Sequence, residues 1–160
     1  MVLPVVPQLQ EGPAWCWAAV GSMVSTYYAT QLNIGAPMSQ CQVASKTLAR
    51  PCCPSPPAPP NCNVQQNLQK ALLLLGRYNN VSLAPNTPGA IGIEIGNGRP
   101  VCAAFQYFQG ALHYLLVTGF DPNAGIVSLI DSATGLLSAG PFSNLLQNNT
   151  GMLAGWILTK

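Results

Sequence analysis

Cys16 is the residue of this sequence best placed to act as a nucleophile. It follows Pro13 at the start of an apolar stretch, residues 14–28, that predicts a helix. Backbone N–H groups at a helix N-terminus point outward unpaired, and the helix dipole is positive there, so this position favours the nucleophilic thiolate. The alternative is that Cys16 is a buried and inert thiol, because free cysteines often serve as small hydrophobic residues.

His113 is the one histidine of the chain. Histidine is the usual general base for a cysteine nucleophile, because its pKa lies near neutrality. The alternative is a histidine that occupies a strand for packing alone. The position of an acidic partner helps to decide between these two interpretations.

The order of the strands is expected to bring Asp131 close to His113. Turn residues at 121–125 separate two strand-like runs. If the first and last residues of this turn face each other, Asp131 lies opposite Leu115, and His113 lies on the same face of the pleat. Such diagonal neighbours are about 7–8 Å apart, within reach of an imidazole and a carboxylate. A slip of one residue would move Asp131 to the other face.

Gln10 is a candidate donor for a developing negative charge. Attack of a thiolate on an amide carbonyl builds an oxyanion, which needs two hydrogen-bond donors. Gln10 lies six residues before Cys16, where its side-chain amide could turn back beside the sulfur. The two donors would then be this amide and the backbone N–H of Cys16. The alternative is a solvated glutamine, and Gln8 competes with Gln10 for the role.

The first half of the chain predicts helices. They are expected at residues 14–29, at 40–50 with Ser39 as the cap, and at 64–76 with Asn63 as the cap and Gly76 as the stop. The helix at 14–29 is apolar almost all round, which indicates a central and buried helix. The apolar face of the helix at 64–76 is expected to include Val64.

The second half of the chain predicts strands. Short β-rich runs are expected at residues 81–83, 100–107, 112–120, 126–131 and 152–159, with a short helix at 89–95. Helices followed by strands indicate an α+β fold with an antiparallel sheet. We expect one domain over residues 1–160, with a helical lobe at about 13–76 packed on a sheet lobe at about 77–160.

The composition argues against several classes of partner. Only 6% of the 160 residues are charged, the net charge is +2, and the basic residues are scattered rather than clustered. Nucleic acids and anionic membranes both require clustered positive charge, so neither is expected as a partner. The strongest apolar run, Ala71 to Leu75, is far too short to span a bilayer, and we expect a monomer.

Four cysteines are clustered around a proline-rich loop, at Cys41, Cys52, Cys53 and Cys62. Their spacing suits a zinc site poorly, so we expect two disulfides rather than a metal. The open pairings are 41–52 with 53–62, and 41–53 with 52–62. Disulfides are typical of secreted proteins, although residues 1–4 lack the features of a leader peptide. Cys102 lies in an apolar run and is expected to be a small buried hydrophobic residue.

Two segments resemble the active-site motifs of papain-like cysteine peptidases. Residues 10–19 read Gln-Glu-Gly-Pro-Ala-Trp-Cys-Trp-Ala-Ala and are similar to the start of the family's active-site helix. Residues 112–121 read Leu-His-Tyr-Leu-Leu-Val-Thr-Gly-Phe-Asp and are similar to its histidine strand, and Asp131 stands where the family has Asn or Asp. The Cys-Trp-Ala-Ala form and the Cys-Cys loop are closest to small secreted bacterial enzymes, a group that includes plant-pathogen effectors. In these enzymes Pro often follows the third catalytic residue, which corresponds to Asp131, whereas this sequence has Ser132 at that position.

The resemblance implies a two-lobed fold and a role for each candidate residue. Cys16 is the implied nucleophile, His113 the base and then the acid, Asp131 the residue that orients the histidine, and Gln10 the oxyanion donor. We therefore expect an endopeptidase that cleaves protein or peptide substrates through a thioester, without a metal or an organic cofactor. The expected location is extracellular in bacteria, or reached by effector-type export.

Two other functions are compatible with the same residues. A deamidase, a transglutaminase or an amidase can use the same Cys-His-Asp arrangement, because a fold does not fix the substrate. The chain could also be a non-catalytic binding module held together by disulfides, with an inert Cys16. The reactivity of Cys16 toward alkylation at mildly acidic pH separates the second of these from an enzyme.

Overall fold

The computed structural model describes residues 1–82 and 88–160. Helices α1 (Cys16–Gln31), α2 (Gln40–Leu48) and α3 (Leu68–Leu74) come first. Strand β1 (Tyr78–Ser82) and helix α4 (Pro88–Gly96) follow, and the later elements are β2 (Val101–Tyr107), β3 (Leu112–Asp121), β4 (Ile126–Asp131), β5 (Leu136–Pro141), α5 (Phe142–Leu146), β6 (Gln147–Asn148) and β7 (Gly151–Thr159). This order confirms the predicted α+β class.

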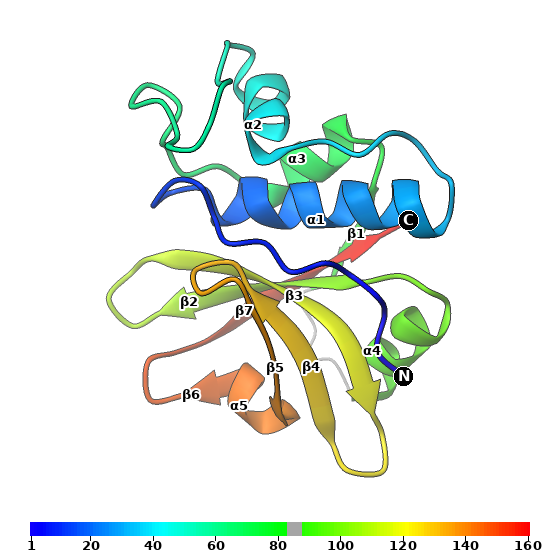
Figure 1. Ribbon diagram of the computed structural model, residues 1–160. Coiled ribbons are helices and arrows are strands. Elements are labelled where there is room, and N and C mark those ends of the chain that lie inside the picture. The colour runs from blue at the N-terminus through cyan, green and yellow to red at the C-terminus, as the bar shows by residue number, and fades with distance from the viewer. Residues whose placement is uncertain (83–87) are drawn as a thin grey trace.

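The strands form one curled, antiparallel sheet. The strand order is β1-β7-β2-β3-β4-β5, and β6 pairs with β7 outside this path. Helices α1, α2 and α3 gather on one side of the sheet, while α5 and β6 lie at the end far from them (Figure 1). In the described part of the chain, no helix combines the length and hydropathy that a bilayer crossing requires.

Helix α1 is buried on nearly all sides, as its apolar sequence predicts. The side chains of Trp17, Val20 and Val24 are inaccessible to solvent, and even Ser22 and Ser25 are buried. The two serines satisfy their hydroxyl groups by donating to backbone carbonyls, Ser22 to Met38 O and Ser25 to Ser22 O. A helix packed in this way holds its first residue, Cys16, in a fixed position.

Helix α2 begins where the sequence predicts. Ser39 Oγ accepts a hydrogen bond from the backbone N–H of Gln42, and the Gln42 side chain accepts one from the backbone N–H of Ser39. This reciprocal arrangement satisfies two N–H groups at the helix N-terminus that lack a partner within the helix.

Helix α3 begins later than predicted, so Asn63 as its cap was wrong. The cap is Asn67, whose Oδ1 accepts from the backbone N–H of Gln69 at 2.8 Å. Asn63 Oδ1 accepts instead from the backbone N–H of Ala14 at 2.9 Å, which fixes this segment against the N-terminal region. Val64 therefore lies outside the helix and is exposed. The stop at Gly76 fits the structure, because its φ of +69° suits glycine.

The predicted strands are present, although the first of them lies only partly within the described residues. The run at 81–83 corresponds to β1, although residue 83 lies outside the described residues. The helix at 89–95 corresponds to α4. The segment from β5 to β6 was not predicted, because Leu136–Pro141 is mostly exposed and lacks the alternation of a half-buried strand.

The β3–β4 hairpin places Leu115 opposite Asp131, as predicted, although the residues paired at the turn differ from the prediction. The turn is wider than expected, because Asp121 pairs with Ile126 rather than with Gly125. A bulge then inserts Thr118 between Val117 and Gly119 and restores the predicted register. The two deviations cancel before the pairing reaches Asp131.

The four clustered cysteines form two disulfides. Cys41 bonds to Cys53, and Cys52 bonds to Cys62, which is the second of the two pairings left open by the sequence. The zinc alternative is therefore wrong. Cys16 and Cys102 are free and buried, so the expectation for Cys102 is confirmed.

Candidate active site

Cys16 is the first residue of α1 and is almost completely buried. The residue at the N-cap position, Trp15, makes no side-chain hydrogen bond to the helix end. Its indole Nε1 donates instead to Cys62 O at 2.7 Å, so Trp15 anchors the start of α1 to the second disulfide. The sulfur thus stands at an uncapped helix N-terminus, where the positive end of the helix dipole favours negative charge.

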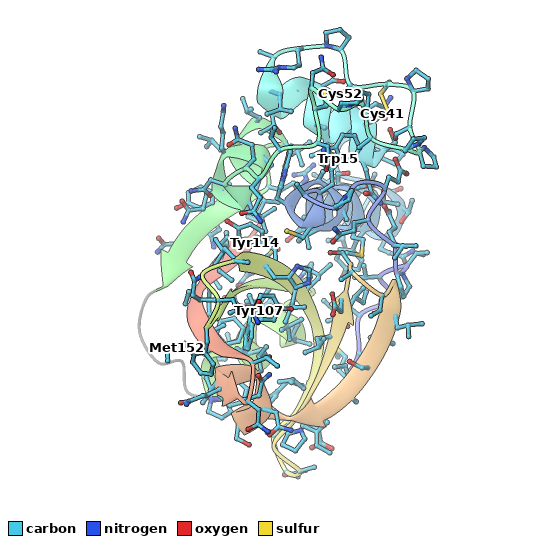
Figure 2. All side chains as sticks on the ribbon, turned by 90° about the vertical axis from the view of Figure 1, so that its left-hand side faces the viewer. Trp15, Cys41, Cys52, Tyr107, Tyr114 and Met152 are labelled. Atoms are coloured by element: carbon cyan, nitrogen blue, oxygen red, sulfur yellow. A yellow bond between two sulfur atoms is a disulfide. The ribbon has the colours of Figure 1, made fainter. Side chains whose placement is uncertain are left out.

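The region before Cys16, residues 10–15, is braced by the disulfide loop. Ala58 donates its backbone N–H to Glu11 O at 3.0 Å, and the Ser55 hydroxyl donates to the Glu11 carboxylate. A Cβ on Gly12 would come within 2.6 Å of the Ala58 Cβ, so the two segments approach as closely as glycine allows. Figure 2 shows Trp15 on the side of Cys41 and Cys52.

His113 lies on β3 and interacts with both other members of the predicted constellation. Its Nε2 is 2.7 Å from Asp131 Oδ1, and the Cys16 side chain is close enough to raise the pKa of its ring. Because Nε2 meets the carboxylate, Nδ1 is the nitrogen left for the sulfur. Burial lowers the pKa of His113, but the hydrogen bonds to Asp131 and Cys16 outweigh burial and raise the pKa to about 9.

Asp131 ends β4 and remains ionised beside the histidine. Burial raises its pKa, but the hydrogen bonds from His113 and from the backbone N–H of Ala133 prevail, and the pKa is lowered. The Ala133 N–H lies 2.8 Å from the same Oδ1 that faces His113. The carboxylate is therefore oriented from two directions.

Gln10 lies near Asp131, because Gln10 is hydrogen-bonded to Ser132, the residue that follows Asp131 in the chain. The backbone N–H of Gln10 donates to Ser132 O at 2.8 Å, and Ser132 Oγ donates to Gln10 Oε1 at 3.3 Å. The Gln10 amide nitrogen donates to Gly12 O at 2.9 Å and to Pro13 O at 2.8 Å. Gln10 thus turns back over the segment that leads to Cys16, with its amide N–H groups engaged within that segment.

Gln8, the competing glutamine, is drawn elsewhere. Its Oε1 accepts a hydrogen bond from Gln40 Nε2 at 3.4 Å, on the side of helix α2. Gln40 is buried and also donates to Leu9 O at 2.8 Å, so it fastens the N-terminal segment next to Gln8. Of the two glutamines, Gln10 is the one that contacts the neighbour of Asp131.

Tyr107 belongs to this cluster, although the sequence reasoning missed it. Its ring stacks on the His113 ring, with centroids 6.1 Å apart and an interplanar angle of 30°. Burial raises the pKa of Tyr107, and the charges of Asp131 and Cys16 raise it further, which places the phenol near both. The signal was available, because Phe105 pairs with His113 and Tyr107 follows on the same face.

Several hollows lie in this region, and two of them lie on opposite faces of strands β2 and β3. One, of about 460 Å³, is lined by Tyr107, Leu115 and Asp131 together with residues of β4, β5 and α5. The other, of about 280 Å³, is lined by Tyr114 and Trp156 and by Asn67 and Gln69 at the start of α3. Among the described residues, no group of His, Cys, Asp and Glu side chains is arranged to hold a metal ion.

The match to a protein family agrees with this geometry. The family model described as papain-like cysteine protease AvrRpt2 matches residues 2–150, a range that includes all four predicted site residues. The chain therefore belongs to this family of papain-like cysteine proteases. It is an enzyme that acts on protein substrates, and the alternative of a non-catalytic binding module is excluded. A comparison with the curated proteins gives no match.

Proposed function

We propose that this protease hydrolyses peptide bonds through a thioester on Cys16, with His113, Asp131 and Gln10 as its catalytic partners. One observation carries the proposal: His113 interacts with Cys16 and Asp131 at the same time, and the distance from its Nε2 to Asp131 Oδ1 is 2.7 Å. A base that contacts both a nucleophile and an orienting acid is the geometry that nucleophilic catalysis requires.

The pKa directions support an ion pair between His113 and Asp131 in the resting enzyme. The pKa of His113 is raised to about 9, so its ring is protonated at neutral pH, while the lowered pKa of Asp131 keeps the carboxylate charged. An imidazolium next to Cys16 stabilises a thiolate, which is the reactive form of cysteine. Asp131 fixes the orientation of the ring and stabilises its positive charge.

The reaction then proceeds in two halves. The Cys16 thiolate attacks the substrate carbonyl, and the carbonyl π electrons move to the oxygen. When the tetrahedral intermediate collapses, the C–N bond breaks and His113 gives its proton to the leaving amine, which leaves a thioester. The neutral His113 next takes a proton from water, the hydroxide attacks the thioester, and the C–S bond breaks to regenerate the thiolate and the imidazolium.

Gln10 and the backbone N–H of Cys16 are the proposed oxyanion donors. In the resting state the Gln10 amide nitrogen donates to Gly12 O and Pro13 O. One of these hydrogen bonds must be exchanged for the oxyanion when the intermediate forms. Ser132 Oγ donates to the oxygen of the Gln10 amide, so the exchange requires only a rotation of that amide group.

The wider context of the proposal follows the family. We propose a monomeric papain-like domain over residues 1–160, with a helical lobe at about 13–76 and a sheet lobe at about 77–160. The family and the two disulfides are consistent with export, and we propose a secreted or effector-type enzyme. We propose no metal, organic cofactor, nucleic acid or membrane as a partner.

The test combines proteolysis with labelling of the thiol. The wild-type protein and Cys16→Ala are incubated with casein, new N-termini are counted, and adducts with an epoxide thiol inhibitor are measured by mass. We expect cleavage and one adduct for the wild type, and neither for Cys16→Ala. Release of ammonia from a glutamine peptide without new N-termini would contradict the proposal and indicate a deamidase.

A further inference from the structure

Gln40 is a buried polar side chain to which the proposed mechanism assigns no role. It is the first residue of helix α2, and it is 2% exposed. Its Nε2 donates to Leu9 O at 2.8 Å and to Gln8 Oε1 at 3.4 Å, and its Oε1 accepts from the backbone N–H of Glu11 at 2.9 Å. Burying an amide costs free energy unless its hydrogen bonds are made, and here both its nitrogen and its oxygen have partners.

Two of these hydrogen bonds fall on the residues that flank Gln10. A backbone carbonyl only accepts and a backbone N–H only donates, so a single side chain that binds Leu9 O and the Glu11 N–H must offer both a donor and an acceptor. The amide of Gln40 meets this requirement. The backbone N–H of Gln10 itself donates to Ser132 O at 2.8 Å, so the chain at residue 10 is held both from α2 and from the residue that follows β4.

Gln40 has a fixed base from which to hold this segment. On one side of it, Ser39 caps α2 through its reciprocal hydrogen bonds with Gln42. On the other side, Cys41 is joined to Cys53 by a disulfide. A side chain whose own backbone is constrained in this way transmits a defined position to the groups that it binds.

A firm backbone at residue 10 matters because the side chain of Gln10 has to move during the reaction. In the resting state its amide nitrogen donates to Gly12 O and Pro13 O, and one of these bonds must be exchanged for the oxyanion. A donor of an oxyanion hole acts at roughly 2.7–3.1 Å from the charged oxygen, so even a small shift of the backbone carries the amide out of range. Gln40 keeps the pivot of this rotation in place.

We propose that Gln40 is a positioning residue for the oxyanion donor: it holds the backbone on both sides of Gln10 while the Gln10 amide turns toward the developing negative charge. This inference rests on the proposed function and adds a residue to it. In this scheme Gln40 acts only through Gln10. Because the oxyanion exists in the transition state and not in the bound substrate, loss of Gln40 should lower kcat and leave KM nearly unchanged.

The first experiment removes the hydrogen bonds of Gln40 and keeps the length of its side chain. The substrate is a peptide that the wild-type enzyme cleaves, identified from a digest of unfolded casein. We expect kcat of Gln40→Met to fall roughly 10- to 100-fold, with KM within about twofold of the wild type. Gln40→Asn keeps the amide but shortens its reach by one CH₂ group, and its kcat should fall at least roughly fivefold. Titration of Cys16 with the epoxide inhibitor gives the concentration of active enzyme in each preparation.

Thr47→Val is the matched control. Thr47 is also buried in α2, and its hydroxyl donates to Val43 O at 2.7 Å within the helix. The substitution removes a buried hydrogen bond from the same helix and keeps the shape of the side chain. A general loosening of α2 would therefore lower kcat in this variant too, whereas positioning of Gln10 predicts the wild-type kcat and KM.

Two further measurements ask whether Gln40 acts through Gln10. In the Gln10→Ala background, adding Gln40→Met should lower kcat by less than about twofold, because the group that Gln40 positions is already absent. Alkylation of Cys16 by iodoacetamide displaces iodide from a saturated carbon and develops no oxyanion, so its rate in Gln40→Met should match the wild type. A merely structural role would disturb the start of α1 and slow this alkylation.

The outcomes separate this inference from the proposed function. A wild-type kcat in Gln40→Met, an equal loss with and without Gln10, a matching loss in Thr47→Val, or slowed alkylation of Cys16 would overturn the inference and leave the peptidase intact. Failure of both Gln40 variants to fold would assign the residue to stability alone and would also overturn it. If the wild-type enzyme cleaves no peptide, or if Gln10→Ala is as active as the wild type, the proposed function fails at that point and the inference fails with it.

Discussion

The hydrogen bond between Asp131 and His113 has a consequence for the pH dependence of activity. The pKa of His113 is about 9, against an ordinary value of 6.5, and the Asp131 carboxylate is the first of the groups that raise it. The difference amounts to about 3 kcal/mol in favour of the protonated ring, which is what the interactions with Asp131 and Cys16 leave after the opposing cost of burial. Replacing the carboxylate by an amide of the same shape, in Asp131→Asn, removes the Asp131 contribution.

The size of the effect follows from the fraction of protonated histidine. At pH 8 a group with a pKa of about 9 is roughly 90% protonated. If Asp131→Asn removes half of the rise in pKa, the protonated fraction at pH 8 falls roughly threefold, and if it removes all of it, roughly thirtyfold. We expect the alkaline limb of the kcat/KM profile to move to lower pH, with the loss concentrated above pH 7.

The assay is kcat/KM for one peptide between pH 5 and pH 10, together with the rate of Cys16 alkylation over the same range. Asp121→Asn is the matched control, because Asp121 lies at the far end of β3, where its carboxylate accepts from Asn123 and Ala124. This control should keep the wild-type profile. An alkaline limb at the same pH in Asp131→Asn and in the wild type would refute the assignment of the raised pKa to the carboxylate.

Three further predictions concern the oxyanion donor, the pH dependence of stability and a disulfide. Gln10→Ala should lower kcat by about 10²- to 10³-fold, the usual loss for one oxyanion donor, while Gln8→Ala should stay near the wild type; equal effects would contradict the roles given to the two residues. The raised pKa of His113 adds stability that is complete below pH 6.5 and disappears as pH rises toward 9, so the free energy of unfolding measured in urea should fall over that interval, and less so in His113→Gln. The double variant Cys52→Ala/Cys62→Ala opens a loop with a sequence separation of 10 and should lose about 3 kcal/mol in the same measurement; an unchanged midpoint would show that the cross-link adds no stability.

The pairing of His113 with Asp131 could be predicted because both belong to residue types with few members in this chain. One histidine and four acidic residues leave few combinations, and strand alternation selects Asp131 among them. The structure brings His113 together with Asp131 and Cys16, and brings Gln10 next to Ser132.

The register of the hairpin was predicted correctly from a premise that was partly wrong. The observed turn is one residue wider than predicted. Without the bulge at Thr118, this wider turn would have moved Asp131 to the other face of the sheet. Thr118 O accepts from the backbone N–H of Leu3, a contact between the N-terminal segment and β3 that local sequence does not reveal. Local patterns therefore predicted the strands, while the bulge depends on a distant segment.

The features that the sequence did not reveal depend on tertiary contacts. Asn63 has the residue type of a helix cap, but its side chain accepts from Ala14, far away in the sequence. Ser132 acquires its place only when its loop meets Gln10. Strand β5 is exposed on most of its length, so it lacks the hydrophobic pattern from which strands are recognised.

The bulge in β3 lies between the distal turn of the β3–β4 hairpin and the reactive groups. It compensates for the wide turn and keeps Leu115 aligned with Asp131, while the loop at 122–125 lies at the far end of the hairpin. That loop is consequently a suitable place to graft an epitope tag or a fluorophore attachment point while keeping the enzyme's reaction centre intact.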